Sequence, residues 1–106
     1  MPVLAIVVVT AGGIQVSPEP INLTGQGQGA VVIQWDIQTP GWSFTPSGIG
    51  IDNPQFGDGG SPPGNRQRFT WTRKPNGADG STVKYSISVT DGTTPQMVDP
   101  SIINQP

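Results

Sequence analysis

The residues that could do chemistry in this 106-residue chain are few, and most of them are carboxylates. The chain has no histidine and no cysteine, which excludes thiolate nucleophiles, histidine-based zinc sites and serine–histidine–aspartate triads. Seven Asp and Glu residues remain as acids. Because no assembled set of reactive groups is apparent, we predict no catalytic residue, no cofactor and no bound metal, and therefore not an enzyme.

The acidic pair Asp52 and Asp58, with Asn53 between them, is the densest group of oxygen ligands. Calcium requires such ligands, and these three residues are close enough in sequence to share one ion. Their spacing matches no calcium loop, however, and Asp and Asn are common in turns because their side chains bond the nearby backbone. We interpret them as turn formers, with calcium as the open alternative.

The three tryptophans could form a stacking platform for a glycan. Trp35 and Trp71 share a strand face with other apolar residues, which favours burial in the core. Trp42 follows Thr-Pro-Gly at a strand end, where partial exposure is expected. The alternative function is therefore glycan binding by Trp42 together with the segment FGDGGSPPGN, residues 56–65, in which Phe56 and Asp58 are candidate contacts.

The segment 56–65 is otherwise a connection between strands, rich in glycine where the backbone must turn. Phe56 either anchors this connection to the core or presents an apolar tip to a partner, and we favour the anchor. A second reactive pair, Ser81 with Lys84, could act as a nucleophile and its activator. Lys84 falls on a polar strand face, however, and an activated lysine requires desolvation.

The N-terminal run from Val3 to Val9 is apolar on both faces. A secretory signal carries a basic region before its apolar run, and this run has none. It is also too short to span a bilayer, so we predict a strand, no membrane span and, by default, a cytoplasmic protein. If Leu4, Ile6 and Val8 are not covered by the chain itself, they form an adhesive edge. A protein partner or a second copy of the chain would then cover them.

The charge distribution argues against nucleic acid as a partner. All five basic residues lie between Arg66 and Lys84, but the net charge is −2 and most of them alternate with strand residues. Such a pattern is typical of a solvated sheet face rather than of a phosphate-binding track.

These side chains must be positioned by strands, because 15 glycines and 12 prolines leave little room for helices and β-branched residues are abundant. Strict apolar and polar alternation predicts half-buried strands in AVVIQWDIQ (30–38) and TVKYSISVTD (82–91). Further strands are expected in RQRFTWTR (66–73) and, as short pieces, in the segments that follow. These are 3–9, 14–16, 21–23, 42–44, 48–51 and 97–103.

Clusters of Gly, Pro, Asn and Asp separate these strands, and KPNGADGS (74–81) is predicted to be a hairpin connection. One domain spanning residues 1–106, an all-β Greek-key sandwich of about seven strands, accounts for this spacing. The predicted core consists of Ile33, Trp35, Ile37, Phe69, Trp71, Val83, Tyr85, Ile87 and Val89.

Two features resemble the immunoglobulin-like sandwiches: an inward-facing Trp35 in VVIQWDI, and KYSISVTDG, which is similar to the penultimate strand of many bacterial members. The resemblance implies a corner tyrosine at Tyr85. The ending MVDPSIINQP is similar to that of small stand-alone bacterial proteins of this fold, which have no established activity. A structural or protein-interaction module is the function that this resemblance implies.

Overall fold

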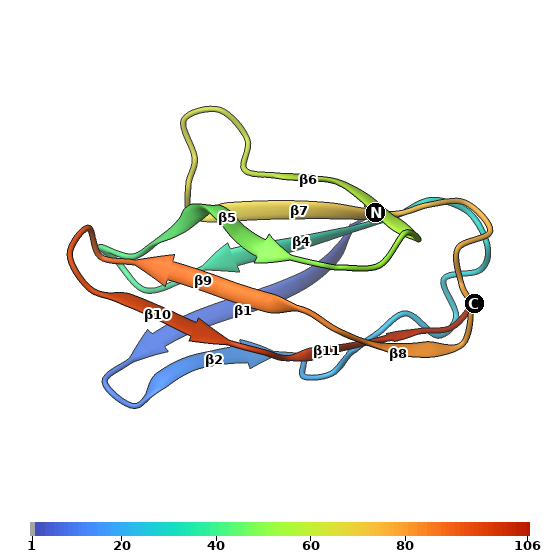
Figure 1. Ribbon diagram of the computed structural model, residues 1–106, viewed down its shortest axis with the longest axis horizontal. Coiled ribbons are helices and arrows are strands. Elements are labelled where there is room, and N and C mark those ends of the chain that lie inside the picture. The colour runs from blue at the N-terminus through green and yellow to red at the C-terminus, as the bar shows by residue number, and fades with distance from the viewer. Residues whose placement is uncertain (1) are drawn as a thin grey trace.

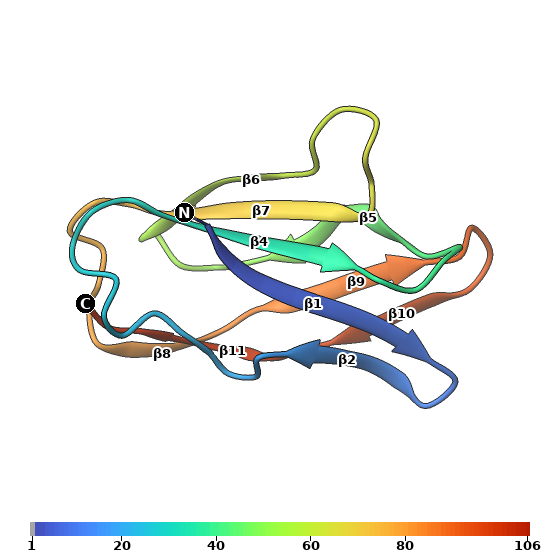
Figure 2. The same ribbon diagram turned by 180° about the vertical axis from the view of Figure 1, so that it is seen from behind.

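The computed structural model describes residues 2–106, which form an all-β protein (Figures 1 and 2). No helix occurs among these residues, so none could cross a membrane. Eleven strands follow one another along the chain. They are β1 (Val3–Thr10), β2 (Gly13–Ser17), β3 (Ile21–Asn22), β4 (Val31–Ile37), β5 (Ser43–Gly50), β6 (Phe56–Gly60), β7 (Arg68–Arg73), β8 (Ser81–Lys84), β9 (Ser86–Thr90), β10 (Pro95–Val98) and β11 (Ser101–Asn104).

The strands form two layers. One layer is a five-stranded sheet in the order β2-β1-β4-β7-β6, and the other contains two three-stranded sheets, β10-β9-β5 and β3-β11-β8. These two smaller sheets join where β8 runs into β9, because the Tyr85 N–H donates to the Pro100 carbonyl oxygen at 3.0 Å. Side chains of the two layers meet in the core, as the edge-on pair of Phe44 and Phe69 illustrates, with ring centroids 5.6 Å apart.

Period-two alternation places the apolar residues of each strand on the inner side, as predicted. In β4 the burial alternates from Val31 to Ile37, and its antiparallel partner β7 opposes Trp35 with Phe69. Eight of the nine predicted core residues are buried, which confirms the alternation argument, whereas Trp71 is only half-buried. The core also includes members from the less regular strands. These are Ala5, Val7, Val9, Ile21, Leu23, Val31, Phe44, Ile49, Ile51, Phe56 and Ile102.

The prediction of about seven strands is wrong, because prolines and irregular pairings divide the chain more finely. Asp99-Pro100 separates β10 from β11, although both follow one line across the second layer in Figure 1. Conversely, β5 continues through Pro46, which was expected in a turn, with a register shift between Phe44 and Ile49. β5 lies at the edge of its sheet, where a proline costs no ladder bond on the free side.

The segment 56–65, which was expected to be a connection, forms a strand in its first half. Phe56 pairs with Arg73 and Gly57 with Thr72, so Phe56–Gly60 forms the edge strand β6. Only the remainder, which includes Pro62 and Pro63, is a loop, and it projects beyond the layers in both views (Figures 1 and 2). Glycines conceal this strand from the sequence pattern because they carry no alternating side chains.

The segment 74–81 is not a hairpin connection. β7 belongs to the five-stranded sheet and β8 pairs with β11, so this segment crosses from one layer to the other. A second crossing joins β2 to β3 through Ser17-Pro18 and Glu19-Pro20, both of which have cis peptide bonds. The expected strand pieces at 14–16 and 21–23 therefore belong to different sheets.

Candidate functional site

The outer face of the five-stranded sheet carries the largest exposed apolar side chains of β1 and β4. The inward residues Ala5, Val7 and Val9 are buried, so Leu4, Ile6 and Val8 face outward, where Leu4 is 56% exposed. Val32 of β4, which is 40% exposed, lies on the same outer face. We call Leu4, Ile6, Val8 and Val32 the apolar stripe.

The stripe lies on the outer face of the sheet, and only its start at Leu4 borders a strand edge. β1 pairs in parallel with β4 from Val3 to Val7 and antiparallel with β2 from Ile6 to Thr10. Only Ile6 and Val7 pair on both sides, and Val3–Ala5, with Leu4 among them, have no β2 partner. A partner could contact Ile6 and Val8 through their side chains, whereas beside Leu4 it could also pair with the Val3–Ala5 edge that β2 leaves uncovered.

Polar groups border the stripe and carry little net charge. Next to Ile6 in the register, Asp36 accepts from Arg68 Nε at 2.8 Å and from Gln34 Nε2 at 2.8 Å. This is an ion pair between partly exposed side chains, and it neutralises the carboxylate nearest the stripe. Thr70 and Thr72 continue the polar surface along β7.

The residues predicted for a glycan site are not brought together. Trp42 is half-buried against the core, and its carbonyl oxygen accepts from Gln67 Nε2 at 3.1 Å. Phe56 is 5% exposed, so its side chain anchors β6 to the core instead of forming a tip. Asp58 is exposed in β6 with a φ of 58°.

Of the candidate calcium ligands, Asn53 acts in a local turn. The Asn53 side-chain oxygen accepts from the Gln55 N–H at 2.8 Å, and its carbonyl oxygen accepts from the Phe56 N–H at 3.1 Å. Within residues 2–106, no group of three or more acidic side chains is placed so that it could hold a metal ion. The hydrogen bond that the Asn53 side chain accepts therefore supports the turn-former interpretation at this residue.

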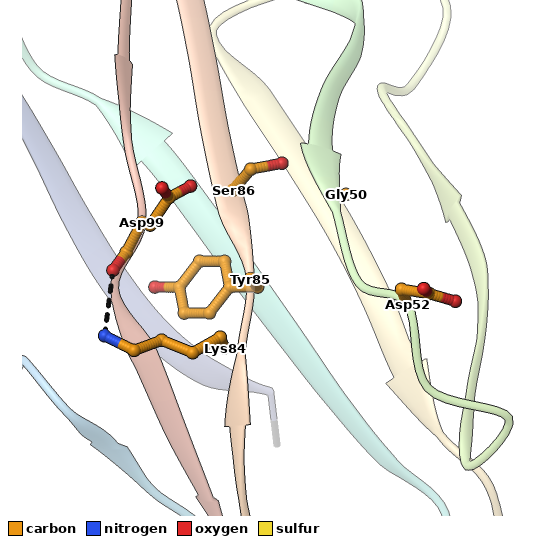
Figure 3. Close-up of a pocket in the computed structure, with 6 residues that line it drawn as sticks. All are labelled: Gly50, Asp52, Lys84, Tyr85, Ser86 and Asp99. Carbon is orange, nitrogen blue, oxygen red and sulfur yellow. Dashed lines mark hydrogen bonds between the residues drawn. The ribbon is translucent and has the colours of Figure 1, made fainter.

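The sheet on the opposite side of the molecule carries a groove on its outer face (Figure 3). A hollow of about 450 Å³ is lined by Gly50, Ser86 and the buried Tyr85, with the charged residues Asp52, Lys84 and Asp99 around them. Figure 3 shows Ser86 and Gly50 on adjacent strands, with Asp52 beyond Gly50 and with Lys84 reaching toward Asp99. Lys84 Nζ donates to the Asp99 carbonyl oxygen at 3.4 Å, which leaves the Asp99 carboxylate unengaged.

A second hollow of about 390 Å³ continues the groove past the free edge of β5. It shares Gly50, Asp52 and Ser86 with the first hollow and ends at Trp71. The Trp71 Nε1–H donates to the Ile49 carbonyl oxygen at 2.8 Å, so the indole lies beside the edge of β5. Its half-buried position follows from this location between the layers.

A buried aromatic pair lies at the centre of the core. Trp35 and Tyr85 have ring centroids 5.4 Å apart, and Trp35 Nε1–H donates to the Tyr85 hydroxyl oxygen at 3.1 Å. Burial raises the pKa of Tyr85 well above its usual range, so the phenol stays protonated. The recorded partner of this hydroxyl is a side chain and not the upstream backbone that a corner tyrosine would bond.

One end of the core is closed by Arg73, which is fully buried. Its guanidinium donates to the carbonyl oxygens of Gly27 and Gln105, at 2.6 and 3.2 Å, and to the Asn104 side-chain oxygen at 3.3 Å. Asn104 in turn donates to the Gly77 carbonyl oxygen at 2.8 Å and to Asp79 at 3.0 Å. Arg73 Nε has no partner among the described residues, and burial lowers the pKa of Arg73.

The pair Ser81 and Lys84 does not form a reactive site. Ser81 pairs with buried Asn104 and its hydroxyl donates to Asp79, whereas Lys84 lies exposed on the outer face. The two side chains thus point to opposite sides of β8. The hydrogen bonds from Ser81 lower the pKa of Asp79.

Sequence reasoning missed the groove and the buried arginine for different reasons. Arg73 has the same parity as Phe69 and Trp71, so strict alternation through β7 would have placed it inward. The groove joins Gly50, Ser86 and Trp71 from three strands, and no local pattern relates them.

No protein-family model matches the chain, and a search of curated proteins finds none that matches it.

Proposed function

We propose that this protein is an immunoglobulin-like β-sandwich that acts as a non-catalytic protein-interaction module and self-associates through the apolar stripe. The observation that carries this proposal is the exposure of Leu4, at 56%, on the outer face of β1. Exposed apolar side chains that form a contiguous group on a sheet face are typical of surfaces that bind protein.

A second copy fits the stripe better than a charged partner does. The stripe itself carries no ionisable group, and the adjacent Asp36 is already paired with Arg68. A two-fold axis that is parallel to the sheet and perpendicular to β1, passing beside Ile6, would place Leu4 of one copy near Val8 of the other, so the same patch serves both subunits. Four side chains are far fewer than the roughly 20 to 30 residues per side of a stable interface, so we expect a weak dimer.

The immunoglobulin-like assignment rests on the inward Trp35 in β4 and on its contact with Tyr85 across the layers. The order β4-β7-β6 opposite β5-β9-β10 also agrees with such a sandwich. The parallel pairing of β1 with β4 is a departure, because it inserts a strand between β2 and β4. The non-catalytic assignment is supported by the separation of Ser81 from Lys84.

Sedimentation velocity over a wide concentration range tests the proposal. We expect the sedimentation coefficient to rise with concentration, and Leu4→Lys to abolish the rise because it puts a charge in the stripe. Met97→Lys is the matched control, since Met97 is 69% exposed on the opposite layer. A monomer at millimolar concentration, or equal effects of the two substitutions, would overturn the proposal.

A further inference from the structure

We infer that the groove around Gly50 and Ser86 binds an uncharged carbohydrate, at a site separate from the apolar stripe. The groove lies on the outer face of the β10-β9-β5 sheet, and the stripe lies on the outer face of the other layer. A ligand in the groove would therefore leave the self-association surface free.

The groove exists because small residues occupy its floor. Gly50 pairs with Ser86 across β5 and β9, and a Cβ atom added to Gly50 would lie 3.0 Å from Ser86 Oγ. Any larger residue at position 50 would fill the space between Gly50 and Ser86. The two hollows that meet here, of about 450 and 390 Å³, each lie in the size range of small-molecule sites.

The polar groups around the floor suit hydroxyl groups. The carboxylates of Asp52 and Asp99 have no side-chain hydrogen-bond or ion-pair partner within residues 2–106, and both can accept from sugar hydroxyls. Lys84 can donate, and Ser86 can do both. A ligand that presents alternating donors and acceptors would satisfy all four side chains at once.

The far end of the groove supplies apolar surface. The Nε1–H of Trp71 is already bonded to the Ile49 carbonyl oxygen, so the exposed part of the indole offers carbon atoms to a ligand. Aromatic surface beside polar groups suits a sugar ring, whose C–H groups are apolar and whose hydroxyls are polar. Gly59 leaves room for the Trp71 indole, because a Cβ atom at position 59 would overlap that indole.

The charges around the groove favour a neutral ligand. Two carboxylates, Asp52 and Asp99, outweigh the single ammonium group of Lys84, so the groove would repel an anion. A neutral polyol meets no such repulsion and gains charge-assisted hydrogen bonds from all three.

The test is binding of the full chain to an array of uncharged oligosaccharides, followed by titration of each hit with NMR detection. We expect shifts of the Gly50 and Ser86 amides and of the Trp71 indole N–H. Ser86→Ala and Asp52→Ala should each weaken binding by roughly three- to tenfold, as the loss of one hydrogen bond predicts. Neither side chain has a recorded partner in the fold, so both variants should fold normally.

Ser88→Ala is the matched control, because Ser88 has the same outward direction on β9 but lies opposite Met97, beyond the groove. It should leave the affinity unchanged. Absence of binding across the array would overturn the inference, as would hits whose affinity Ser88→Ala and Ser86→Ala reduce equally. The sedimentation behaviour of Ser86→Ala should match that of the wild type, which distinguishes this site from the stripe.

Discussion

The centre of the core and its loop-bearing end both bury polar groups, but they satisfy them in different ways. At the centre, the Trp35 Nε1–H donates to the Tyr85 hydroxyl oxygen, so one hydrogen bond between two neutral side chains serves both polar groups. At the end, Arg73 has no carboxylate within ion-pair distance among residues 2–106 and donates to the neutral oxygens of Gly27, Asn104 and Gln105.

The difference shows what each region contributes to the fold. The aromatic pair joins two strands of opposite layers by filling space. The arginine joins loops, because it donates to Gly27 and Gln105 directly and is linked to Gly77 through Asn104. A buried cation without an anion is costly, so this end depends on every acceptor being in place.

The largest effect is expected at the arginine end. Asn104→Leu removes an acceptor from Arg73 and also leaves the Gly77 carbonyl oxygen unpaired, so the free energy of unfolding should fall by about 3 kcal/mol. Urea denaturation measures the loss. Gln105→Leu is the control, because only its backbone oxygen takes part. A loss no greater than that of the control would show that Arg73 does not depend on Asn104.

A smaller loss is expected at the centre. Tyr85→Phe keeps the packing but leaves the Trp35 N–H without its acceptor, so the free energy of unfolding should fall by about 1 to 2 kcal/mol. Urea denaturation of this variant and of Asn104→Leu compares the two regions directly. If Tyr85→Phe costs more than Asn104→Leu, the ranking of the two regions is reversed.

The same tyrosine predicts an alkaline limit to stability. Burial raises the pKa of Tyr85 in the folded state, so the unfolded chain ionises first, near pH 10. Stability is complete below that pH and is lost above it, by at most about 1.4 kcal/mol per pH unit for one proton. Tyr85→Phe should flatten this slope in denaturation curves measured from pH 9 to pH 11. An unchanged slope would assign the loss to other groups.

The smallest effects are expected in acid, where two loops can be compared. Hydrogen bonds from Ser81 lower the pKa of Asp79, and backbone N–H groups of Thr94 and Thr93 lower that of Asp91. Both contributions are present above the usual aspartate pKa and disappear as the pH falls below it. Ser81→Ala should raise the pKa of Asp79 and leave that of Asp91 unchanged in an NMR carboxyl titration. Equal changes at both would contradict local control.

Strands with alternating side chains could be predicted, and strands without them could not. β4 and β9 follow the pattern of Val31–Ile37 and Ser86–Thr90, where each inward residue is apolar. β6 escaped prediction because glycine occupies three of its five positions. The crossing at residues 74–81 was read as a hairpin because turn residues indicate a reversal and do not say which sheet the chain enters next.

The candidate sites also differ in whether a local sequence pattern could identify them. Leu4, Ile6 and Val8 were identified because an apolar residue at every position of a strand must leave one face apolar, whichever strand covers the other. Trp42 and Asp58 were suggested by residue type and by their expected places at a strand end and in a connection, and neither of them lines the groove. Trp71 was assigned wholly to the core, although it lies between the two layers beside the β5 edge.

The sequence by itself determined the all-β class, most of the inward-facing residues and the limits on chemistry that follow from lacking histidine and cysteine. Those properties depend on composition and on spacing over a few residues. Only the tertiary structure decided that β1 lies between β2 and β4, that Arg73 is enclosed by three distant segments, and that Gly50, Ser86 and Trp71 share one groove. Each of these depends on which strands pair, and pairing is settled by the packing of the whole chain.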